Sequence, residues 1–288
     1  MTTIEALNSA FNKNFTTDNL KNVKHNDFQK YISGNIDKIN YENFIDPKQQ
    51  RDLSLKFHWG HNHDFGNNFK LIGKMKERHI EIIASFIDDY GLPRDLEGKK
   101  ILDIGVWTGG TSLLLTALGA KVYAIEEVPQ YASMVNYLAW AFGVENKLRC
   151  FSMSLYEFLP MFADEFDYII YSGVIYHVTD PLISLRMIFT ALKDGGSVFL
   201  ETLGNDFANS VCLYEGPGTY SSGNKDNLNR GGWNYFIPSI SCLDRWCKDV
   251  GFQKVKIGSL VQKRIKGVAC RITYRDYCRA GASIKSIR

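Results

Sequence analysis

Two stretches of the chain combine sharp turns with residues that could do chemistry. KKILDIGVWTGG (residues 99–110) is an apolar run that enters a glycine turn and carries Asp103. YSGVIYHV (171–178) ends another apolar run and carries Tyr176 and His177. Buried strands of an α/β sheet end in such turns at the edge where ligands bind. The two stretches therefore predict one site, with His177 as the candidate base and Tyr176 beside it.

The glycine turn departs from a dinucleotide-binding loop. The pattern is DxGxxxGG, with Trp107 where the middle glycine of GxGxxG often stands. Gly105 permits a turn that a Cβ would obstruct, and Gly109 lets the backbone approach a ligand closely. The acid Asp103 suits a cationic ligand end, such as the amino acid part of S-adenosylmethionine, better than a pyrophosphate. A second acid, Glu126, ends the next apolar run, where it can accept hydrogen bonds from two ribose hydroxyls.

Alternating patterns indicate the elements that must position these residues. Apolar residues at helical spacing alternate with short apolar runs from about residue 75 onward. Helices are predicted at 74–91, 111–119, 129–143, 180–196 and 238–251, and strands at 99–105, 120–127, 147–154, 166–173, 197–203, 252–258 and 267–275. This alternation favours a parallel sheet covered on both faces. Residues 1–75 are expected to form a helical extension with a loop, and 204–232 is too long for a passive connection.

Composition excludes several classes of protein. The chain has 288 residues, 45% of them hydrophobic, and a net charge of +3. It lacks an apolar run of membrane-spanning length and the apolar core of a signal peptide, so no membrane partner is expected. Six cysteines without a CxxC pair indicate reduced thiols in a cytoplasmic protein. Residues 254–288 hold ten Lys or Arg and one acid, either a phosphate-facing strip or a solvated face.

Taken together, the motifs resemble the class I S-adenosylmethionine-dependent methyltransferases. LDIGVWTGG resembles their first motif, AIEE the acidic end of the second strand, and FDYIIYSGVIYHV and LKDGGSVFLET the fourth and fifth strands. The resemblance implies a Rossmann-like, doubly wound, seven-stranded and mostly parallel sheet over residues 76–288. It implies S-adenosylmethionine as cofactor and S-adenosylhomocysteine as product. The cofactor-binding residues would be Asp103, Gly105, Trp107, Gly109, Glu126, Ser154, Leu155 and Ser172.

One branch of that family is more similar. SGVIYHVTDPLISL, LETL and NYFIPSISCLDRWCKDVGF resemble the bacterial enzymes that carboxymethylate wobble uridine in tRNA with carboxy-S-adenosylmethionine. By this resemblance Tyr176 touches the extra carboxylate of the cofactor. The branch also uses a lysine before the first strand and a late arginine. WGHNHDFG has no lysine at the matching place, and the late position falls near Lys266, so plain methyl transfer is favoured.

Further residues are candidates for the walls of the site. KFHWGHNHD is interpreted as a loop over the cofactor, with Trp59 contacting it and His61 and His63 contacting the acceptor. No metal is expected, because no further ligand cluster accompanies these histidines. Glu201 could orient the acceptor or act as a cap. In RGGWNYFIPS, Trp233 and Tyr235 are candidate wall residues.

Three functions remain open from the sequence. The leading hypothesis is methyl transfer to an oxygen or nitrogen of a small-molecule acceptor, by a protein that could form a homo-oligomer. The first alternative is a tRNA wobble-uridine (carboxy)methyltransferase, which would bind tRNA. The second is a non-catalytic binding protein with a Rossmann fold, because fold alone does not fix function. A nicotinamide oxidoreductase would need the GxGxxG loop that this chain lacks.

Overall fold

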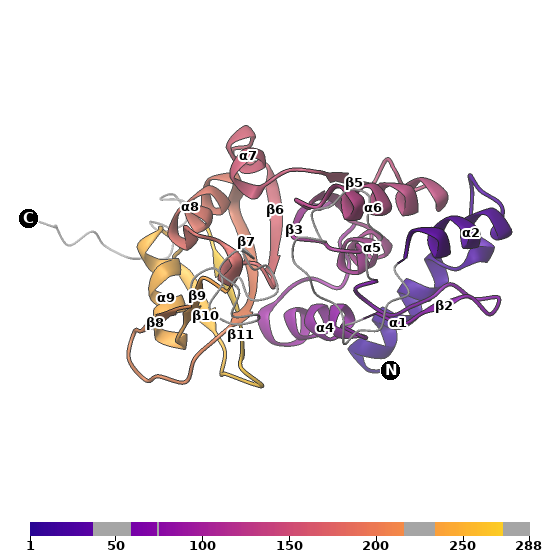
Figure 1. The fold of residues 1–288 in the computed structure, drawn as a ribbon. Helices are drawn as coiled ribbons and strands as arrows, with labels where there is room; N and C mark the ends of the chain where they lie inside the picture. Colours follow the sequence, from indigo (N-terminus) through magenta and orange to yellow (C-terminus); the bar gives the residue numbers. More distant parts are fainter. Residues whose placement is uncertain (37–58, 74, 216–233, 273–288) are drawn as a thin grey trace, which may run out of the picture.

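The computed structural model describes residues 1–36, 59–73, 75–215 and 234–272. Its centre is a seven-stranded sheet of order β10-β11-β7-β6-β3-β4-β5 (Figure 1). Within this sheet β11 alone runs against the other strands. The predicted seven-stranded, mostly parallel sheet is thereby confirmed. Its strands are β3 (Lys100–Ile104), β4 (Lys121–Ile125), β5 (Leu148–Phe151), β6 (Phe166–Ser172), β7 (Leu192–Leu203), β10 (Lys254–Ile257) and β11 (Arg264–Cys270).

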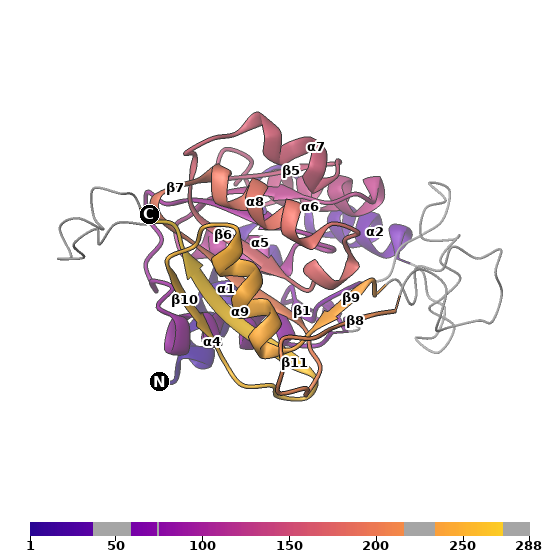
Figure 2. The same cartoon turned by 90° about the vertical axis from the view of Figure 1, so that its left-hand side faces the viewer.

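Helices cover both faces of the sheet, as parallel strands require. One hydrophobic core joins the sheet to α4, α5 and α6, and a second joins it to α7, α8 and α9 (Figures 1 and 2). Helix α4 buries Ile80 and Ile83 and ends at Gly91, whose φ of 82° closes the helix in the left-handed region. The helices are α4 (Arg78–Tyr90), α5 (Gly110–Ala117), α6 (Pro129–Ala141), α7 (Leu155–Phe158), α8 (Pro181–Ala191) and α9 (Ile240–Asp249).

The N-terminal extension packs against the first of these cores. It contains α1 (Thr3–Asn14), the short 3-10 helix η1 (Thr17–Asn19) and α2 (His25–Asn35). A capping box of Thr2 and Glu5 starts α1, and Phe11 and Phe28 are buried with residues of α5 and α6. Residues 1–36 are thus mainly helical as predicted, and residues 37–58 of the extension lie outside the described residues. A small antiparallel pair, β1 (His63–Asp64) with β2 (Lys70–Leu71), lies where only a loop was expected.

A second small antiparallel pair corrects the prediction for residues 204–232. That stretch was expected to be a loop, but its described part, residues 204–215, contains β8 (Cys212–Tyr214), which pairs with β9 (Phe236–Pro238). Residues 216–232 lie outside the described residues. Strands of three residues are too short for an alternating pattern, so the sequence carried no signal for them. Two 3-10 turns, η3 (Leu159–Met161) and η4 (Ile175–His177), complete the described elements. Within the described residues, no helix combines the length and apolarity needed to span a membrane.

Candidate active site

The carboxyl edge of β3 and β6 is the point where the strand order reverses. From β3 the chain builds β4 and β5 on one side and then returns to β6 and β7 on the other. Gly105 follows β3 with a φ of +74° and faces Val174, which follows β6. A Cβ at Gly105 would lie 2.5 Å from the Val174 Cγ2 atom. The glycine is therefore required, and the edge is the expected position of a ligand site.

Glu126 is held at this edge by backbone groups. Its Oε2 accepts a hydrogen bond from the Trp107 N–H at 2.9 Å, and its Oε1 accepts one from the Val128 N–H at 3.0 Å. Burial raises the pKa of Glu126, while these two N–H groups oppose the rise. Each carboxylate oxygen keeps a lone pair, so the side chain can still accept the ribose hydroxyls of an adenosyl cofactor.

Asp103 is a second carboxylate, buried beside the first. It is 3% exposed and accepts a hydrogen bond from the Ser112 hydroxyl at 2.6 Å. The pKa of Asp103 is raised to about 7, chiefly by burial; the hydrogen bond from Ser112 opposes the rise, and the charge of Glu126 adds to it. A cation placed here would favour the ionised form of both acids. The pair therefore fits the cationic amino acid end and the ribose of S-adenosylmethionine.

After Gly105, the turn contains two further residues with positive φ. Trp107 has a φ of 49° and Gly109 a φ of 77°. Gly109 is the N-cap of α5, where a Cβ would lie 2.8 Å from the Val135 Cγ2 atom. The turn packs so closely on α6 that position 109 has no room for a Cβ. Trp107 has a backbone conformation in the same positive-φ region, although it carries a full side chain.

The histidine-rich segment lies directly against the glycine turn. The Gly60 N–H donates to the Thr108 hydroxyl at 3.0 Å, and the His61 ring centroid is 6.3 Å from that of Trp107. A Cβ at Gly110 would lie 2.8 Å from the His61 Nδ1 atom. The segment therefore packs on the turn, and its role as a loop over the cofactor stays a prediction. Contact of His61 with an acceptor stays a prediction.

Two residues predicted to contact ligands are buried in the aromatic core instead. His63 is 3% exposed, its Nε2 pairs with the Phe15 carbonyl oxygen at 2.9 Å, and its ring stacks on Phe65 at 3.5 Å. Trp59 is 4% exposed and packs 6.1 Å from Phe65. The N-terminal helices supply this aromatic environment, which the local sequence did not reveal. His63 therefore anchors the extension, and Trp59 has little surface left for a cofactor.

Tyr176 belongs to a charged cluster at the same edge of the sheet. Its hydroxyl accepts a hydrogen bond from Arg264 Nη1 at 3.1 Å, and Arg264 also lies 3.4 Å from Glu201. Glu201 is 1% exposed, pairs with Arg78 at 2.5 Å, and accepts from the Ser172 hydroxyl at 3.3 Å. Burial is the largest cause that raises the pKa of Tyr176, so this phenol is neutral. Two guanidinium groups and one carboxylate leave this cluster with a charge of +1.

The other residues predicted for the site lie beside Tyr176, at the start of α7, or outside the described residues. The His177 ring centroid is 4.0 Å from that of Tyr176, and the Tyr235 N–H donates to the Tyr176 carbonyl at 2.7 Å. Ser154 caps α7 by a capping box, and Leu155 packs in the second core. Trp233 lies outside the described residues.

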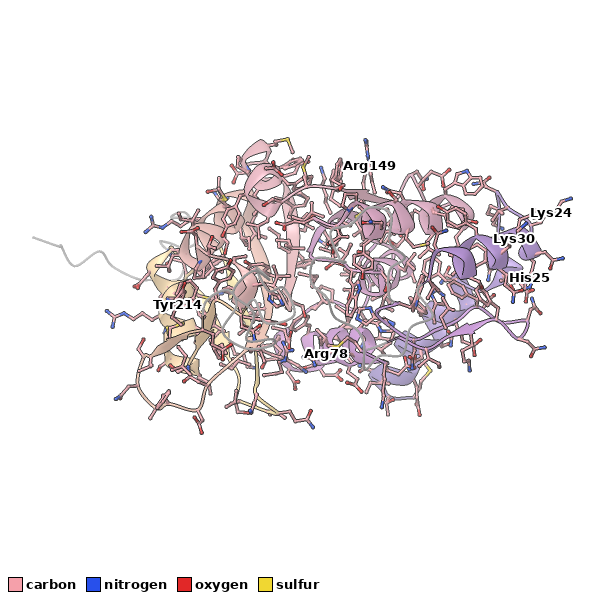
Figure 3. All side chains as sticks on the ribbon, viewed as in Figure 1. Lys24, His25, Lys30, Arg78, Arg149 and Tyr214 are labelled. Atoms are coloured by element: carbon pink, nitrogen blue, oxygen red, sulfur yellow. The ribbon has the colours of Figure 1, made fainter. Side chains whose placement is uncertain are left out.

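Sequence reasoning missed Arg78 and Arg264. Arg78 begins α4 (Figure 3), and Arg264 begins β11, two residues before the position, Lys266, that the resemblance had suggested. Residues two apart on a strand share one face. Lys266 is the Cα partner of Glu201, so Arg264 lies on the same face of the sheet as this acid. The two-residue spacing between Arg264 and Lys266 could have indicated Arg264, but only with knowledge of the register of β11 on β7.

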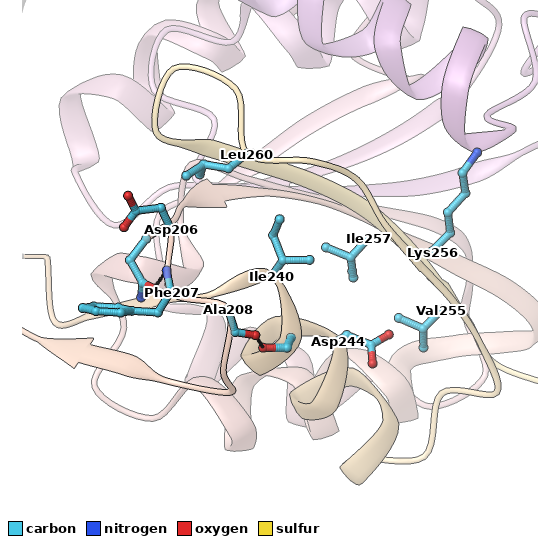
Figure 4. A pocket seen from close by; sticks show the side chains of 11 residues that line it. Asp206, Phe207, Ala208, Ile240, Asp244, Val255, Lys256, Ile257 and Leu260 are labelled. Carbon is cyan, nitrogen blue, oxygen red and sulfur yellow. Dashed lines mark hydrogen bonds between the residues drawn. The ribbon is translucent and has the colours of Figure 1, made fainter.

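A separate cavity of about 670 Å³ lies near α9 (Figure 4). Its walls include Asn205, Phe207, Ile240, Ser241, Val255 and Leu260, and none of the predicted site residues. Across the described part of the chain, no group of three or more His, Cys, Asp or Glu side chains is arranged to hold a metal ion.

Comparisons with known proteins identify the class that this fold and site define. A family model described as "Methyltransferase domain" matches residues 75–257. A tRNA U34 carboxymethyltransferase of Campylobacter hominis is 29% identical over 198 residues, which cover 62% of each chain. One of Desulfotalea psychrophila is 33% identical over 170 residues, covering 57% of this chain and 48% of the relative. The chain thus spans about half to three fifths of these relatives.

Solved structures share the fold. The N-terminal domain of EvdMO1 with S-adenosylhomocysteine has a TM-score of 0.56 and 12% identity, covering 87% of this chain and 98% of that one. Phosphoethanolamine N-methyltransferase 2 of Haemonchus contortus with S-adenosylmethionine has a TM-score of 0.50 and 17% identity, covering 73% and 55%. The fold is that of the Rossmann-like S-adenosylmethionine-dependent methyltransferases. The chain belongs to the methyltransferase domain family, and S-adenosylmethionine is the cofactor indicated for it.

Proposed function

We propose that this methyltransferase transfers a carboxymethyl group from carboxy-S-adenosylmethionine to the wobble uridine of tRNA. The observation that carries the proposal is the Tyr176–Arg264 pair, which lies with Glu201 and Arg78 beside the cofactor edge. The relatives that carry the name tRNA U34 carboxymethyltransferase support the same assignment. This proposal replaces small-molecule methyl transfer as the preferred function.

The charge of the cluster explains why a carboxylate would bind there. Both guanidinium groups are partly buried, and the buried Glu201 is shared between Arg78 and Arg264. The excess positive charge would be neutralised by one carboxylate. Arg264 presents a fork of donors that fits a carboxylate, and the neutral Tyr176 hydroxyl can donate a further hydrogen bond. The missing lysine of the N-terminal segment is thereby compensated by two arginines from other elements.

The transfer is an in-line displacement at the carbon that the sulfonium of the donor activates. The chain must align the acceptor, exclude water and accept a proton from an acceptor hydroxyl. His177 is placed for the last role, because its ring is partly exposed and lies 4.0 Å from the Tyr176 ring.

Calorimetry with both donors tests the carboxylate site. We expect the full chain to bind carboxy-S-adenosylmethionine more tightly than S-adenosylmethionine. Arg264→Gln should weaken binding of the carboxylated donor roughly 10- to 100-fold, because a hydrogen bond to a charged group contributes about 1.5–3 kcal/mol. Binding of S-adenosylmethionine should change less than about threefold. Lys266→Gln, on the same strand and face, is the matched control and should leave both affinities unchanged.

Turnover with tRNA tests the acceptor. The chain is incubated with each donor and with tRNA that carries uridine or 5-hydroxyuridine at position 34, and the nucleosides are then analysed by mass spectrometry. A gain of a carboxymethyl group at position 34 supports the proposal. Preference for plain S-adenosylmethionine and no product on tRNA would refute it. The second candidate would then lead: methyl transfer to a small anionic acceptor, whose carboxylate or phosphate the same positive cluster could hold.

A further inference from the structure

Two cysteines far apart in sequence meet where α9 begins. Cys212 lies on β8 with Pro238 of β9 as its Cα partner, and Cys242 lies in the first turn of α9. The N-cap Ser239 connects them, because its hydroxyl accepts hydrogen bonds from the Cys242 N–H and from the Val211 N–H, both at 3.2 Å. The two thiols are themselves joined by a side-chain hydrogen bond.

The two thiols of this pair differ in acidity. The hydrogen bond from Cys212 lowers the pKa of Cys242, with help from Ser210 and against burial, because a donated proton stabilises the thiolate. The same hydrogen bond raises the pKa of Cys212. By contrast, burial raises the pKa of Cys247, also on α9, to about 12. Cys242 is thus the nucleophile of the pair, and Cys212 is the thiol next to it.

We propose that Cys212 and Cys242 form a redox-sensitive thiol pair that hydrogen peroxide converts into an intrachain disulfide. The Cys242 thiolate attacks one peroxide oxygen, the O–O bond breaks, and the hydroxide that leaves takes up a proton to form water. Cys242 is then a sulfenic acid. The Cys212 sulfur attacks the Cys242 sulfur, its proton leaves with the displaced hydroxide as a second water, and the S–S bond forms. Two thiols and one peroxide give one disulfide and two waters.

Access for peroxide is from the side of Cys212. Cys212 is partly exposed, while Cys242 next to it is buried with 6% exposure. The cavity of about 670 Å³ borders the same turn of α9, since Ile240 and Ser241 line it (Figure 4). Cys247, on the same helix, offers less access, because it is 0% exposed within the second core.

The bridge would fix one end of the β8–β9 pair, whose other end contacts Tyr176. Cys212 and Pro238 are at the first end, where α9 begins. At the other end the Glu215 N–H donates to the Tyr235 carbonyl at 3.0 Å, and the Tyr235 N–H donates to the Tyr176 carbonyl at 2.7 Å. Figures 1 and 2 show β8 and β9 beside α9. The disulfide would therefore hold this strand pair against both the helix and the tyrosine turn.

Mass spectrometry of the full chain after treatment with a small excess of peroxide tests the proposal. We expect the loss of two of the six thiols and one linked peptide pair containing Cys212 and Cys242, both reversed by dithiothreitol. Cys212→Ser should stop at a sulfenic acid on Cys242, which dimedone labels. Hydrogen exchange of the Tyr235 amide should slow at least about threefold in the oxidised chain, because the bridge limits local opening.

Matched variants decide the outcome. Cys247→Ser, on the same helix, should oxidise like the unaltered chain, and Cys242→Ser should leave Cys212 reduced at the same peroxide dose. Oxidation of Cys212 at an unchanged rate in Cys242→Ser would overturn the proposal. So would a linked peptide that joins either cysteine to a different one. None of these measurements depends on the methyl donor or the acceptor, so the result is independent of the proposed function.

Discussion

Replacing Asp103 by asparagine should stabilise the ligand-free protein at neutral and alkaline pH. The carboxyl group of Asp103 is 3% exposed, and burial raises its pKa from 3.8 to about 7. Between pH 3.8 and about 7 the unfolded chain carries an ionised Asp103 while the folded chain holds it protonated. The contribution of Asp103 to the stability of the fold is therefore fully present below pH 3.8, and it is lost as the pH rises to about 7.

The size of the effect follows from the shift. Each unit of pKa corresponds to about 1.4 kcal/mol, so ionised Asp103 costs the fold up to about 4 kcal/mol above pH 7. An asparagine carries no charge and can still accept the hydrogen bond from Ser112. The stabilisation by Asp103→Asn should thus increase by about 3 kcal/mol between pH 5 and pH 8 and then level off.

Urea unfolding at a series of pH values measures this difference. Both proteins are unfolded without ligand at half-unit steps from pH 5 to pH 9, and the difference in free energy of unfolding is plotted against pH. Asp249→Asn, at an exposed ion pair at the end of α9, is the control and should change the free energy of unfolding by less than about 1 kcal/mol. A flat line for Asp103→Asn would contradict the reasoning, because it would mean that Asp103 has the same pKa in the folded and unfolded chains.

Further predictions concern the cofactor, the histidines and the base. The Kd for S-adenosylhomocysteine, measured by calorimetry, should fall roughly tenfold per pH unit up to pH 7, because the ammonium group of this ligand favours ionised Asp103. In Asp103→Asn the binding should be weak and independent of pH. Burial holds the pKa of His79 well below 6.5, so stability is lost as pH falls below 6.5, and His79→Phe should reduce that loss in urea unfolding. Gly110→Ala, whose Cβ would meet His61, should lower the melting temperature by several degrees and weaken binding of S-adenosylhomocysteine. His177→Asn should lower kcat by roughly 10²–10⁴-fold with an unchanged Kd for the donor, and a loss below threefold would remove His177 as the base.

The spacing of apolar residues along the sequence predicted most of the helices and strands. Ile80 and Ile83 recur at helical spacing and are buried on α4, and Gly91 ends that helix as predicted. The short apolar runs became β3 to β7, because parallel strands buried on both faces need continuous apolar residues. Glycines at sharp turns then fixed which edge could bind a ligand, and Asp103 and Glu126 lie at that edge.

Contacts between distant segments set the limit of the prediction. His63 resembles a ligand-binding residue in its local sequence, but Phe15 and Phe65 enclose it in the folded chain. Arg264 gains its role only from the antiparallel register of β11 on β7, which brings it to Glu201. Neither the local pattern nor the composition contains that register, so the charged cluster around Tyr176 could not be predicted from the sequence.

Trp107 explains how a glycine turn without its middle glycine selects the nucleotide. In dinucleotide loops that glycine lets the backbone approach a pyrophosphate. Here the Trp107 N–H donates to Glu126 at 2.9 Å, so the donor is already occupied by an anion. A pyrophosphate at this place would face the carboxylates of Glu126 and Asp103. The positive φ of Trp107 costs about 1–2 kcal/mol and is retained because it directs this N–H to the acid. The turn therefore disfavours a phosphate-bearing cofactor and favours a nucleoside with a cationic tail, as S-adenosylmethionine is.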